Sequence, residues 1–415
     1  MKLSEKDQSL LSGEQGEAAA MAMRILTTMG RVNGAAEMLD IESAHIDGCL
    51  YHGDSGIDFA QKLVEGGAKA IVPTTLNVGA IDLLHPEHFQ GSDEQAGKAK
   101  ALMGLYAEMG CLPIWTCAPY QTTQRPTFGQ QIAWAESNAI VFANSVLGAR
   151  TNRYGDYFDI CAAITGRVPN VGLHQIKNRR GEIVFDLGQI SPDLLKEDVF
   201  FPVLGYLIGK RSASRIPVIV GLPHTVNEDQ LKALGAASAS SGAVALFHAV
   251  GITPEAPTVE AALQNKPPVE ELVVSSEMVA QMRSHLSTVP DGPIEVVALG
   301  SPHFSLAEFE QLLPLVQSHP PQSEFIVCTH RLVLHALKER GWLEEFKGLG
   351  IDVVVDTCVV VTPIVKARSG TLMTNSGKFA HYTPGNIGFQ VIFGSLEECV
   401  RSAHAGRVWR DEGLW

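Results

Sequence analysis

The sequence has few cysteines and no Cys-x-x-Cys pair. Its seven cysteines are scattered between residues 49 and 399 of a 415-residue chain. This spacing argues against a zinc ribbon or a thioredoxin-type motif, and an odd, scattered set in a long chain argues against a disulfide scaffold. No Gly-x-Gly-x-x-Gly follows an apolar strand, so a dinucleotide-binding fold is poorly supported. We therefore predict that most of the cysteines are small buried apolar residues, with Cys117 and Cys358 as exceptions.

Positive charge and long apolar runs are also scarce. The chain has 32 lysines and arginines against 45 acidic residues, a net charge of −13, which argues against a sequence-independent nucleic-acid binder. No run approaches the roughly 18 apolar residues of a membrane span. The first twenty residues lack the apolar core of a secretion signal. We expect a cytoplasmic protein with neither nucleic acid nor membrane as a partner.

Short apolar runs that end in small, polar or thiol residues recur along the chain. They are Ala68–Thr75, Leu112–Cys117, Ile216–His224, Ile294–His303, Glu324–His330 and Asp352–Cys358. Helical patterns separate many of them, including residues 306–317 and 331–347. Alternating strands and helices predict an α/β fold with mostly parallel sheets. Because ligands bind beyond the carboxyl ends of such strands, one site assembled from several strand ends is expected.

The length of the chain indicates two or three domains. Proline-rich, polar breaks fall at 253–271 and 288–293. We predict an α/β region over 1–270, with more than one domain inside it, and a C-terminal α/β domain over 271–415. The small residues at 235–245 form either a closely packed helix or a flexible loop.

Residues 113–153 carry the densest set of reactive and polar side chains. Leu112–Cys117 reads as a strand that ends at Cys117, and Ile132–Leu147 reads as a helix that is apolar almost all round. An apolar helix is a buried helix, so the polar residues on it, Glu136 and Asn144 among them, need partners inside the protein. This pattern is typical of a small-molecule site.

Two motifs in this stretch, TCAPY (116–120) and AWAESNAIVFANSVLGARTNR (133–153), resemble the large subunit, or catalytic region, of the aconitase X family. Shorter stretches match in the family's order. They are AHIDG (44–48), VPTTLN (72–77), GLH (172–174), GSPHFS (300–305), DTCVV (356–360) and SGKFAHYTPG (376–385). The resemblance implies three aconitase-like α/β/α domains around a central site, and a fourth, mobile domain on a separate small subunit.

The resemblance also implies a hydro-lyase that uses an iron–sulfur cluster or a mononuclear iron. Cys117 and Cys358 each end an apolar run and are the expected metal ligands. Some family members have cysteine where this chain has Ser301. The identity of a third metal ligand is therefore open, and Cys49 is a slightly better candidate for it than Cys328. Without the family, two core cysteines would be the better interpretation of Cys117 and Cys358.

Further site residues follow from the same motifs. The candidate catalytic residues are Glu136, Lys378 and Ser376. The candidate substrate-binding residues are Thr74, Thr75, Asn77, Tyr120, Asn144, Arg150, Asn152, His174 and Ser301. Arginine can donate two parallel hydrogen bonds to a carboxylate, which favours Arg150 for that role. Alternatives remain: Arg150 could compensate a helix terminus or pair with Glu136, the threonines could serve a turn, and Ser376 with Lys378 could lie in a surface hairpin.

Two activities are known in the family, and the resemblance leads us to expect one of them. We predict dehydration of cis-3-hydroxy-L-proline to Δ1-pyrroline-2-carboxylate. Ser301 replaces the cysteine that the resemblance associates with the phosphomevalonate branch of the family, and the chain lacks a dense Lys/Arg cluster that would bind a phosphate. The alternative is the large subunit of a mevalonate 5-phosphate dehydratase. An alternative of another class is a metal-free binding or regulatory protein on the same scaffold.

Overall fold

Short strands alternate with helices throughout residues 1–414, the part of the chain that the computed structural model describes. The chain divides into two units, which are described separately. The first holds Met1–Ile81 and Gly91–Arg180, and the second holds Asp82–Gln90 and the chain from Gly181 onward. Among the described residues, no helix is both long and apolar enough to cross a membrane.

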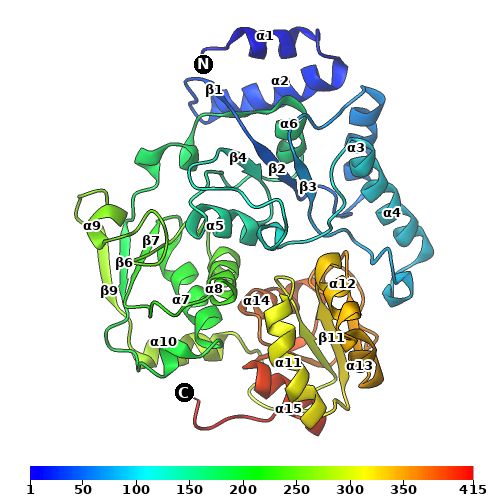
Figure 1. Ribbon diagram of the computed structural model, residues 1–415, viewed down its shortest axis with the longest axis vertical. Helices are drawn as coiled ribbons and strands as arrows, with labels where there is room; N and C mark the ends of the chain where they lie inside the picture. Colours follow the sequence, from blue (N-terminus) through cyan, green and yellow to red (C-terminus); the bar gives the residue numbers. More distant parts are fainter. Residues whose placement is uncertain (415) are drawn as a thin grey trace. The chain divides into compact units, whose positions relative to one another are not determined.

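The first unit contains a three-stranded parallel sheet and an antiparallel pair (Figure 1). The sheet runs β3 (Thr74–Leu76), β2 (Ser43–Ile46), β4 (Ile132–Trp134), and the pair is β1 (Met38–Asp40) with β5 (Arg167–Pro169). Its helices are α1 (Glu5–Ser12), α2 (Glu17–Val32), α3 (Asp54–Glu65), α4 (Asp93–Glu108), α5 (Ser137–Ser145) and α6 (Phe158–Thr165). Short 3₁₀ turns lie at η2 (Pro119–Gln121), η3 (Gly172–His174) and η4 (Ile176–Asn178).

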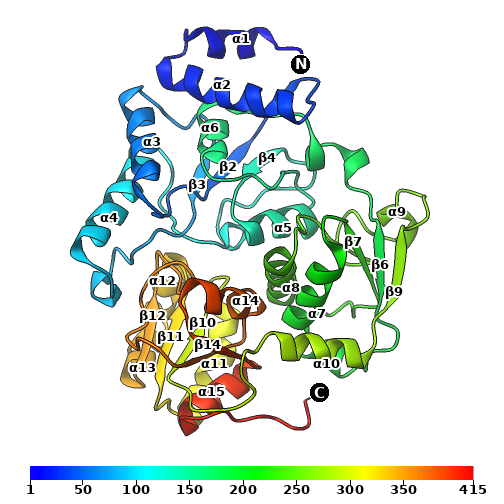
Figure 2. The ribbon, with the colours of Figure 1, turned by 180° about the vertical axis from the view of Figure 1, so that it is seen from behind.

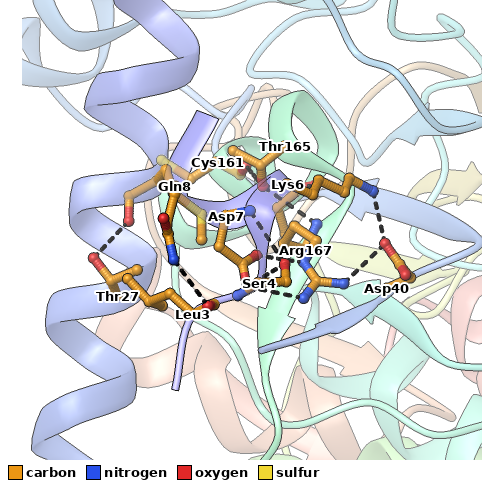
Figure 3. Close-up of polar contacts among 12 residues, drawn as sticks. Leu3, Ser4, Lys6, Asp7, Gln8, Thr27, Asp40, Cys161, Thr165 and Arg167 are labelled. Atoms are coloured by element: carbon orange, nitrogen blue, oxygen red, sulfur yellow. Dashed lines mark hydrogen bonds and ion pairs between the residues drawn. The ribbon is translucent and has the colours of Figure 1, made fainter. Parts of the chain in front are cut away.

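A buried ion pair ties α1 to β5 in this unit. Ser4 caps α1, and Asp7 in its first turn accepts hydrogen bonds from the Nε and Nη2 of Arg167, at 2.8 and 3.2 Å (Figure 3). The other side of the guanidinium faces Asp40, which also contacts Lys6. Asp7 and Arg167 are buried, whereas Asp40 is exposed. The pair therefore holds the N-terminal helix on the unit by charge as well as by packing.

The second unit has two parallel sheets. The first runs β8 (His248–Ala249), β7 (Pro217–Val220), β6 (Ile183–Asp186), β9 (Glu270–Val273). Its helices are α7 (Phe200–Ser212), α8 (Glu228–Ser241), α9 (Val259–Ala262) and α10 (Ser276–His285). A Cβ atom on Gly205 of α7 would lie 2.2 Å from the carbonyl oxygen of Leu234, so only glycine allows α7 and α8 to pack this closely.

The second sheet of this unit runs β12 (Ile351–Val354), β11 (Glu324–Cys328), β10 (Val296–Leu299), β13 (Thr371–Thr374), β14 (Gln390–Phe393). Figure 2 shows the helices around it, which are α11 (Leu306–Ser318), α12 (Arg331–Glu339), α13 (Trp342–Gly348), α14 (Gly377–Asn386) and α15 (Leu396–Ala405). Its strands are apolar on both faces, as burial between helices requires. Their inner residues pack into one core with Phe309 and Leu312 of α11.

The α/β architecture with mostly parallel sheets is confirmed, but several predicted elements are wrong in extent. Of the run Ala68–Thr75, only the last two residues lie in a strand, β3. Leu112–Cys117 forms only an isolated bridge between Leu112 and Thr75, since Trp115 turns the chain with a φ of 46°. The segment Ile132–Leu147 is not one helix, because its first three residues join the sheet as β4. The helix predicted over 331–347 divides into α12 and α13 at Gly341, whose φ is 74°.

Two open alternatives are also decided. The small residues near 235–245 begin in the closely packed helix α8. Ser376 begins a helix, α14, rather than a hairpin. The division into 1–270 and 271–415 stays a prediction. Because β9 starts at Glu270 and pairs with β6, a boundary at that residue would cut a strand, so the break must follow it.

Candidate functional site

The carboxyl edge of the first unit's sheet carries two acids and an amide. Asp47 follows β2, Asn77 follows β3 and Glu136 follows β4, and these three strands are neighbours. Asn77 donates from its Nδ2 to Asp47, while its buried Oδ1 has no partner among the described residues. Glu136 has a φ of 71°, unusual for a residue with a side chain, and its Oε2 accepts from the Ala139 N–H at 2.7 Å. Strain of this kind is common at functional sites.

Burial and neighbouring charge change the acidity of this edge. Burial, with the charges of Asp156 and Glu136, raises the pKa of Asp47 to about 8, although Asn77 opposes this through its hydrogen bond. Burial also raises the pKa of Asp159 to about 7. The Asp159 carboxylate accepts from the Asp47 N–H at 2.7 Å, which holds the Asp47 turn in place. Carboxyl groups with raised pKa values are common at acid–base sites.

Cys117 lies in a loop that a buried polar network supports. Asn138 of α5 donates from its Nδ2 to the Cys117 carbonyl at 2.9 Å and also contacts the Tyr120 hydroxyl. The Tyr120 ring stacks on Phe142 with centroids 3.7 Å apart. Tyr120 is therefore fixed on both its ring and its hydroxyl. Its predicted role in substrate binding would have to be indirect, by shaping the loop.

Asn144, Asn152 and His174 bind the protein itself. The Asn144 amide exchanges hydrogen bonds with the Thr151 backbone and accepts from the buried Arg179. Asn152 contacts the Val171 carbonyl and the Leu173 N–H. Both ring nitrogens of His174 are occupied, by Gln131 and by Tyr154. These contacts support structural roles, and they explain why such polar residues lie on an apolar helix or close after it.

The side chains of Thr74 and Thr75 are hydrogen-bonded within the protein, whereas that of Arg150 keeps a donor that could bind a substrate. The Thr74 hydroxyl donates to the Val72 carbonyl, and the Thr75 hydroxyl bonds His45 Nδ1 at 2.8 Å. The backbone of Arg150 bridges to Gln131, whereas its buried Nε has no partner among the described residues. An unsatisfied guanidinium donor is costly unless something binds it. Arg150 therefore remains a good candidate for a carboxylate ligand.

The carboxyl edge of the C-terminal sheet carries thiols. Ser301 follows β10, Cys328 ends β11 and Cys358 follows β12, and these strands are adjacent in the sheet. A hydrogen bond from the Cys328 thiol is the main cause that lowers the pKa of Cys358 to about 7, against the effect of burial. The Val360 backbone, the Ser301 hydroxyl and the charge of Lys378 act in the same direction. Cys358 is thus poised to be a thiolate.

Ser376 and Lys378 lie at the start of α14, beside this edge. The Ser376 hydroxyl accepts from the Phe379 N–H at 3.0 Å and donates to the Ser301 carbonyl. It therefore caps the helix and fastens it to the Ser301 turn. Ser301 and Ser376 also line a cavity of about 70 Å³ beside Lys232. That volume suits a few water molecules and is too small for a substrate.

Cys49 has a different environment from Cys358. Its sulfur contacts the carbonyls of Ile46, Asn77 and Val78, at 3.4 to 3.8 Å. Burial and the charges of Asp47 and Asp159 hold the pKa of the Cys49 thiol well above its usual range. Burial likewise raises the pKa of Cys111, Cys161 and Cys399. These surroundings favour the protonated thiol and disfavour metal binding at Cys49.

The donor set of the C-terminal edge fits iron held by thiolates. Cys358 has a lowered pKa, a second thiol lies within hydrogen-bonding distance, and Lys378 supplies a positive charge nearby. Thiolates are the usual ligands of iron–sulfur clusters. Within residues 1–414, no three His, Cys, Asp or Glu side chains gather as a ready-made metal site. Two thiols and a hydroxyl are what this edge supplies.

Sequence reasoning did not name Asp47 or Asn138 as candidates, and it ranked Cys328 below Cys49, without knowing that Cys328 lies beside Cys358. Asp47 lies inside the AHIDG motif directly after β2, so the expectation that ligands bind beyond the carboxyl ends of strands could have identified it. Asn138 follows Glu136 in AESNA, but only the fold shows that it reaches the Cys117 carbonyl. The proximity of Cys328 to Cys358 depends on the order of the strands, which the sequence does not reveal.

The chain is similar to curated proteins that are named for a dehydration. The chain is 42% identical over 410 residues to the cis-3-hydroxy-L-proline dehydratase of Pseudomonas aeruginosa, covering 97% of this chain and 70% of that protein. It is 41% identical to the enzyme of the same name from Hypocrea jecorina, covering 98% of this chain and 69% of that protein. It is also 35% identical to the phosphomevalonate dehydratase large subunit of Methanothermobacter thermautotrophicus, covering 96% of this chain and 98% of that protein.

These dehydratase relatives and the α/β fold define the class of the protein as a lyase. Family models match the aconitase X first domain over residues 1–177, the second over 181–284 and the third over 294–405. The crystal structure of aconitase X from Thermococcus kodakaraensis, in its holo-form, superposes with a TM-score of 0.87 at 34% identity, covering 97% of this chain and 100% of that one. The chain belongs to the aconitase X family, which confirms the resemblance.

Proposed function

We propose that the protein dehydrates cis-3-hydroxy-L-proline to Δ1-pyrroline-2-carboxylate. The observation that supports this choice most is the 41–42% identity to two enzymes of that name, against 30–35% to the phosphomevalonate dehydratase large subunits. The acidic edge of the first unit's sheet adds physical support. Glu136 suits the ammonium group of an amino acid better than a phosphate, which a carboxylate would repel.

The reaction removes a proton from the carbon beside the carboxylate and a hydroxyl from the next carbon. Glu136 is the proposed base, because it is an acid at a strand end held by its contact with Ala139. Arg150, whose Nε has no partner within residues 1–414, and Lys378 are the proposed cations for the substrate carboxylate. Ser376, proposed initially as catalytic, is better placed as a positioning residue, since its hydroxyl caps α14.

Cys117 and Cys358 are the proposed iron ligands. Cys358 has a lowered pKa, which favours the thiolate form that binds a metal, and Cys117 lies in a loop that Asn138 holds. Bound iron would supply a Lewis acid for the departing hydroxyl. Its form, a cluster or a single ion, is not part of the proposal. Cys49, the third metal ligand expected from the sequence, is left out of the proposed ligand set because its surroundings favour the protonated thiol.

A small subunit of the aconitase X type is the proposed partner. Some relatives are named large subunits, which implies a second chain. About 30% of the hydroxyproline dehydratase relatives lies outside the match to this chain. A further domain could exclude water from the site, as lids do in many enzymes. We expect this chain alone to be nearly inactive and the reconstituted pair to be active, in the cytoplasm.

The deciding experiment compares kcat/KM for cis-3-hydroxy-L-proline and for mevalonate 5-phosphate, using the chain reconstituted with iron and the small subunit. Preference for the hydroxyproline supports the proposal, and preference for the phosphate would replace it with the second candidate. That candidate has its own support, since the chain covers 98% of a phosphomevalonate dehydratase large subunit. Lack of turnover of either substrate by a fully loaded pair would leave only the dehydratase class.

Two variants test the carboxylate contacts. Arg150→Lys keeps the charge but loses the paired donors, and Lys378→Met removes a charge at similar volume. Each should raise KM for the hydroxyproline by about tenfold or more, since a charge-assisted hydrogen bond contributes about 1.5–3 kcal/mol. The controls are Arg24→Lys, on the exposed side of α2, and Lys366→Met, at an exposed pair with Asp352. Unchanged KM in both test variants would refute this assignment.

A further inference from the structure

Three adjacent strand ends bring Ser301, Cys328 and Cys358 together within the second unit. In the register of the sheet, Leu299 of β10 lies opposite Val327 of β11, and Cys328 lies opposite Val354 of β12. Ser301 thus lies two residues beyond Leu299, the last paired residue of β10, and Cys358 lies four residues beyond Val354, the last paired residue of β12. The Cys358 sulfur is in hydrogen-bonding contact with both the Cys328 thiol and the Ser301 hydroxyl.

The backbone around these residues is held rigidly. Gly300 has a φ of 88°, and a Cβ atom there would lie 2.0 Å from the Cys328 carbonyl oxygen, so the Ser301 turn is packed directly on Cys328. The Phe304 N–H donates to that same carbonyl at 3.0 Å. The turn before Cys358 is anchored by Asp356, which accepts two hydrogen bonds of 2.6 Å from Arg331. A metal site requires such preorganised ligands.

Cys328 differs from the cysteines that only pack. Cys161 and Cys399 are each fully buried on a helix, and burial raises the pKa of both thiols. Cys328 is equally buried, but it ends a strand and contacts another thiol. The charge of Lys378 also acts on Cys358. Two thiols within hydrogen-bonding distance, with a cation nearby, are suited to binding one soft metal centre.

Serine is the weaker donor at this edge. A serine hydroxyl must lose a proton of high pKa to bind iron as an anion, and iron–sulfur centres prefer thiolates. We propose that Cys328 is a thiolate ligand of the iron beside Cys358, and that it supplies the thiolate which Ser301 does not. This inference rests on the proposed iron site and assigns it a residue outside the family-like motifs.

The test uses Cys328→Ser, which keeps the side-chain volume and removes the thiol. Protein purified without oxygen and reconstituted with iron and sulfide is analysed for iron per chain, for visible thiolate-to-iron absorbance and for its electron paramagnetic resonance spectrum. We expect a changed spectrum and at least about tenfold faster loss of iron to a chelator, because even residues outside the ligand set change metal affinity by about 10–100-fold. Cys399→Ser, buried in the same domain, is the matched control and should retain wild-type values.

A rescue variant separates ligation from packing. Ser301→Cys in the Cys328→Ser background returns a thiol to the contact with Cys358, and we expect it to restore iron retention to within about threefold of wild type. A purely structural Cys328 would not be rescued by a thiol on the neighbouring strand end. Rescue that fails while both variants remain folded by circular dichroism would contradict the inference.

The outcomes also separate this inference from the proposed function. In one outcome, the wild-type protein binds iron and Cys328→Ser has the same spectrum and the same iron retention. That result would overturn the role of Cys328 but not the proposed iron site. Wild type that binds no iron under any of these conditions would overturn both.

Discussion

Two sheet edges in this chain have the same architecture and different chemistry. At the carboxyl edge of β3-β2-β4, the strand ends present Asp47, Asn77 and Glu136. At the corresponding edge of β12-β11-β10, they present Cys358, Cys328 and Ser301. Oxygen ligands and carboxyl groups suit proton transfer and cations, whereas thiolates suit iron. Parallel strands thus supply the position, and the residue just beyond each strand supplies the chemistry.

The pKa values at the two edges change in opposite directions for physical reasons. Burial and like charges raise the pKa of Asp47, so this acid tends toward its neutral form. A thiol hydrogen bond from Cys328 lowers the pKa of Cys358, which favours the anion in spite of burial. One edge is therefore suited to proton exchange near neutral pH, and the other is the proposed metal site. The predictions that follow test this separation of roles.

The largest effect is expected at the thiol edge. Cys358→Ala should abolish iron retention and lower kcat of the complete enzyme by at least about 10³-fold, because a Lewis acid contributes several kcal/mol to such a reaction. Iron and acid-labile sulfide per chain are measured beside kcat. Cys161→Ala, in the apolar interior of α6, is the control and should keep its iron. Full iron content in folded Cys358→Ala would remove the thiol edge from the metal site.

The next effect should be on stability alone, away from both edges. Asp7→Asn leaves the buried Arg167 with only the exposed Asp40 (Figure 3), and should lower the free energy of unfolding by about 3 kcal/mol. Asp40→Asn acts on the same arginine from solvent and should cost less than about 1 kcal/mol. Urea unfolding measures both, and kcat per folded molecule should not change. A kcat that falls in Asp7→Asn would link the N-terminal helix to the site.

At the acidic edge, Glu136→Gln should lower kcat by about 10²-fold if Glu136 is the base. The Gln oxygen can still accept from the Ala139 N–H, so the melting temperature should change little. Iron content should also stay at the wild-type level, which distinguishes this edge from the thiol edge. Glu42→Gln, an exposed acid just before β2, is the control. An unchanged kcat would transfer the search for the base to Asp47.

The smallest effect concerns pH and a histidine behind the thiol edge. His303 is fully buried, its Nε2 lies 3.0 Å from the Thr357 carbonyl, and burial lowers its pKa to about 3 from 6.5. Below pH 6.5 the unfolded chain binds a proton at this histidine that the folded chain does not. Stability must therefore fall by up to about 1.4 kcal/mol per pH unit between pH 6.5 and 3 because of this group.

The variant His303→Gln cannot take up this proton. It should be less stable than wild type at pH 7.5, and the difference between the two should narrow as the pH falls to 5. Urea unfolding of the iron-free chains at several pH values measures this. Parallel stability curves for the two proteins would show that His303 is not the source of the acid sensitivity.

The sequence by itself determined the α/β class and several strand ends, because apolar runs bounded by polar or thiol residues have few other interpretations. It located Cys358 at the carboxyl end of a strand, but it placed Glu136 on a helix, whereas Glu136 follows β4 and caps α5. It could not separate β4 from α5, since Ile132–Leu147 is apolar throughout and burial hides the period of either element. It also misread 112–117, where an unusual φ at Trp115 interrupts the expected strand.

Tertiary structure alone decided which polar residues are left for chemistry. Asn144, Asn152 and His174 are similar to the other candidates in sequence, but their hydrogen bonds are taken up by the protein. Cys328 meets Cys358 only because β11 lies between β10 and β12. Strand order and side-chain pairing are long-range properties, so no local pattern encodes them. The sequence determined the kinds of donors present, and the packing of the strands decided which of them act together.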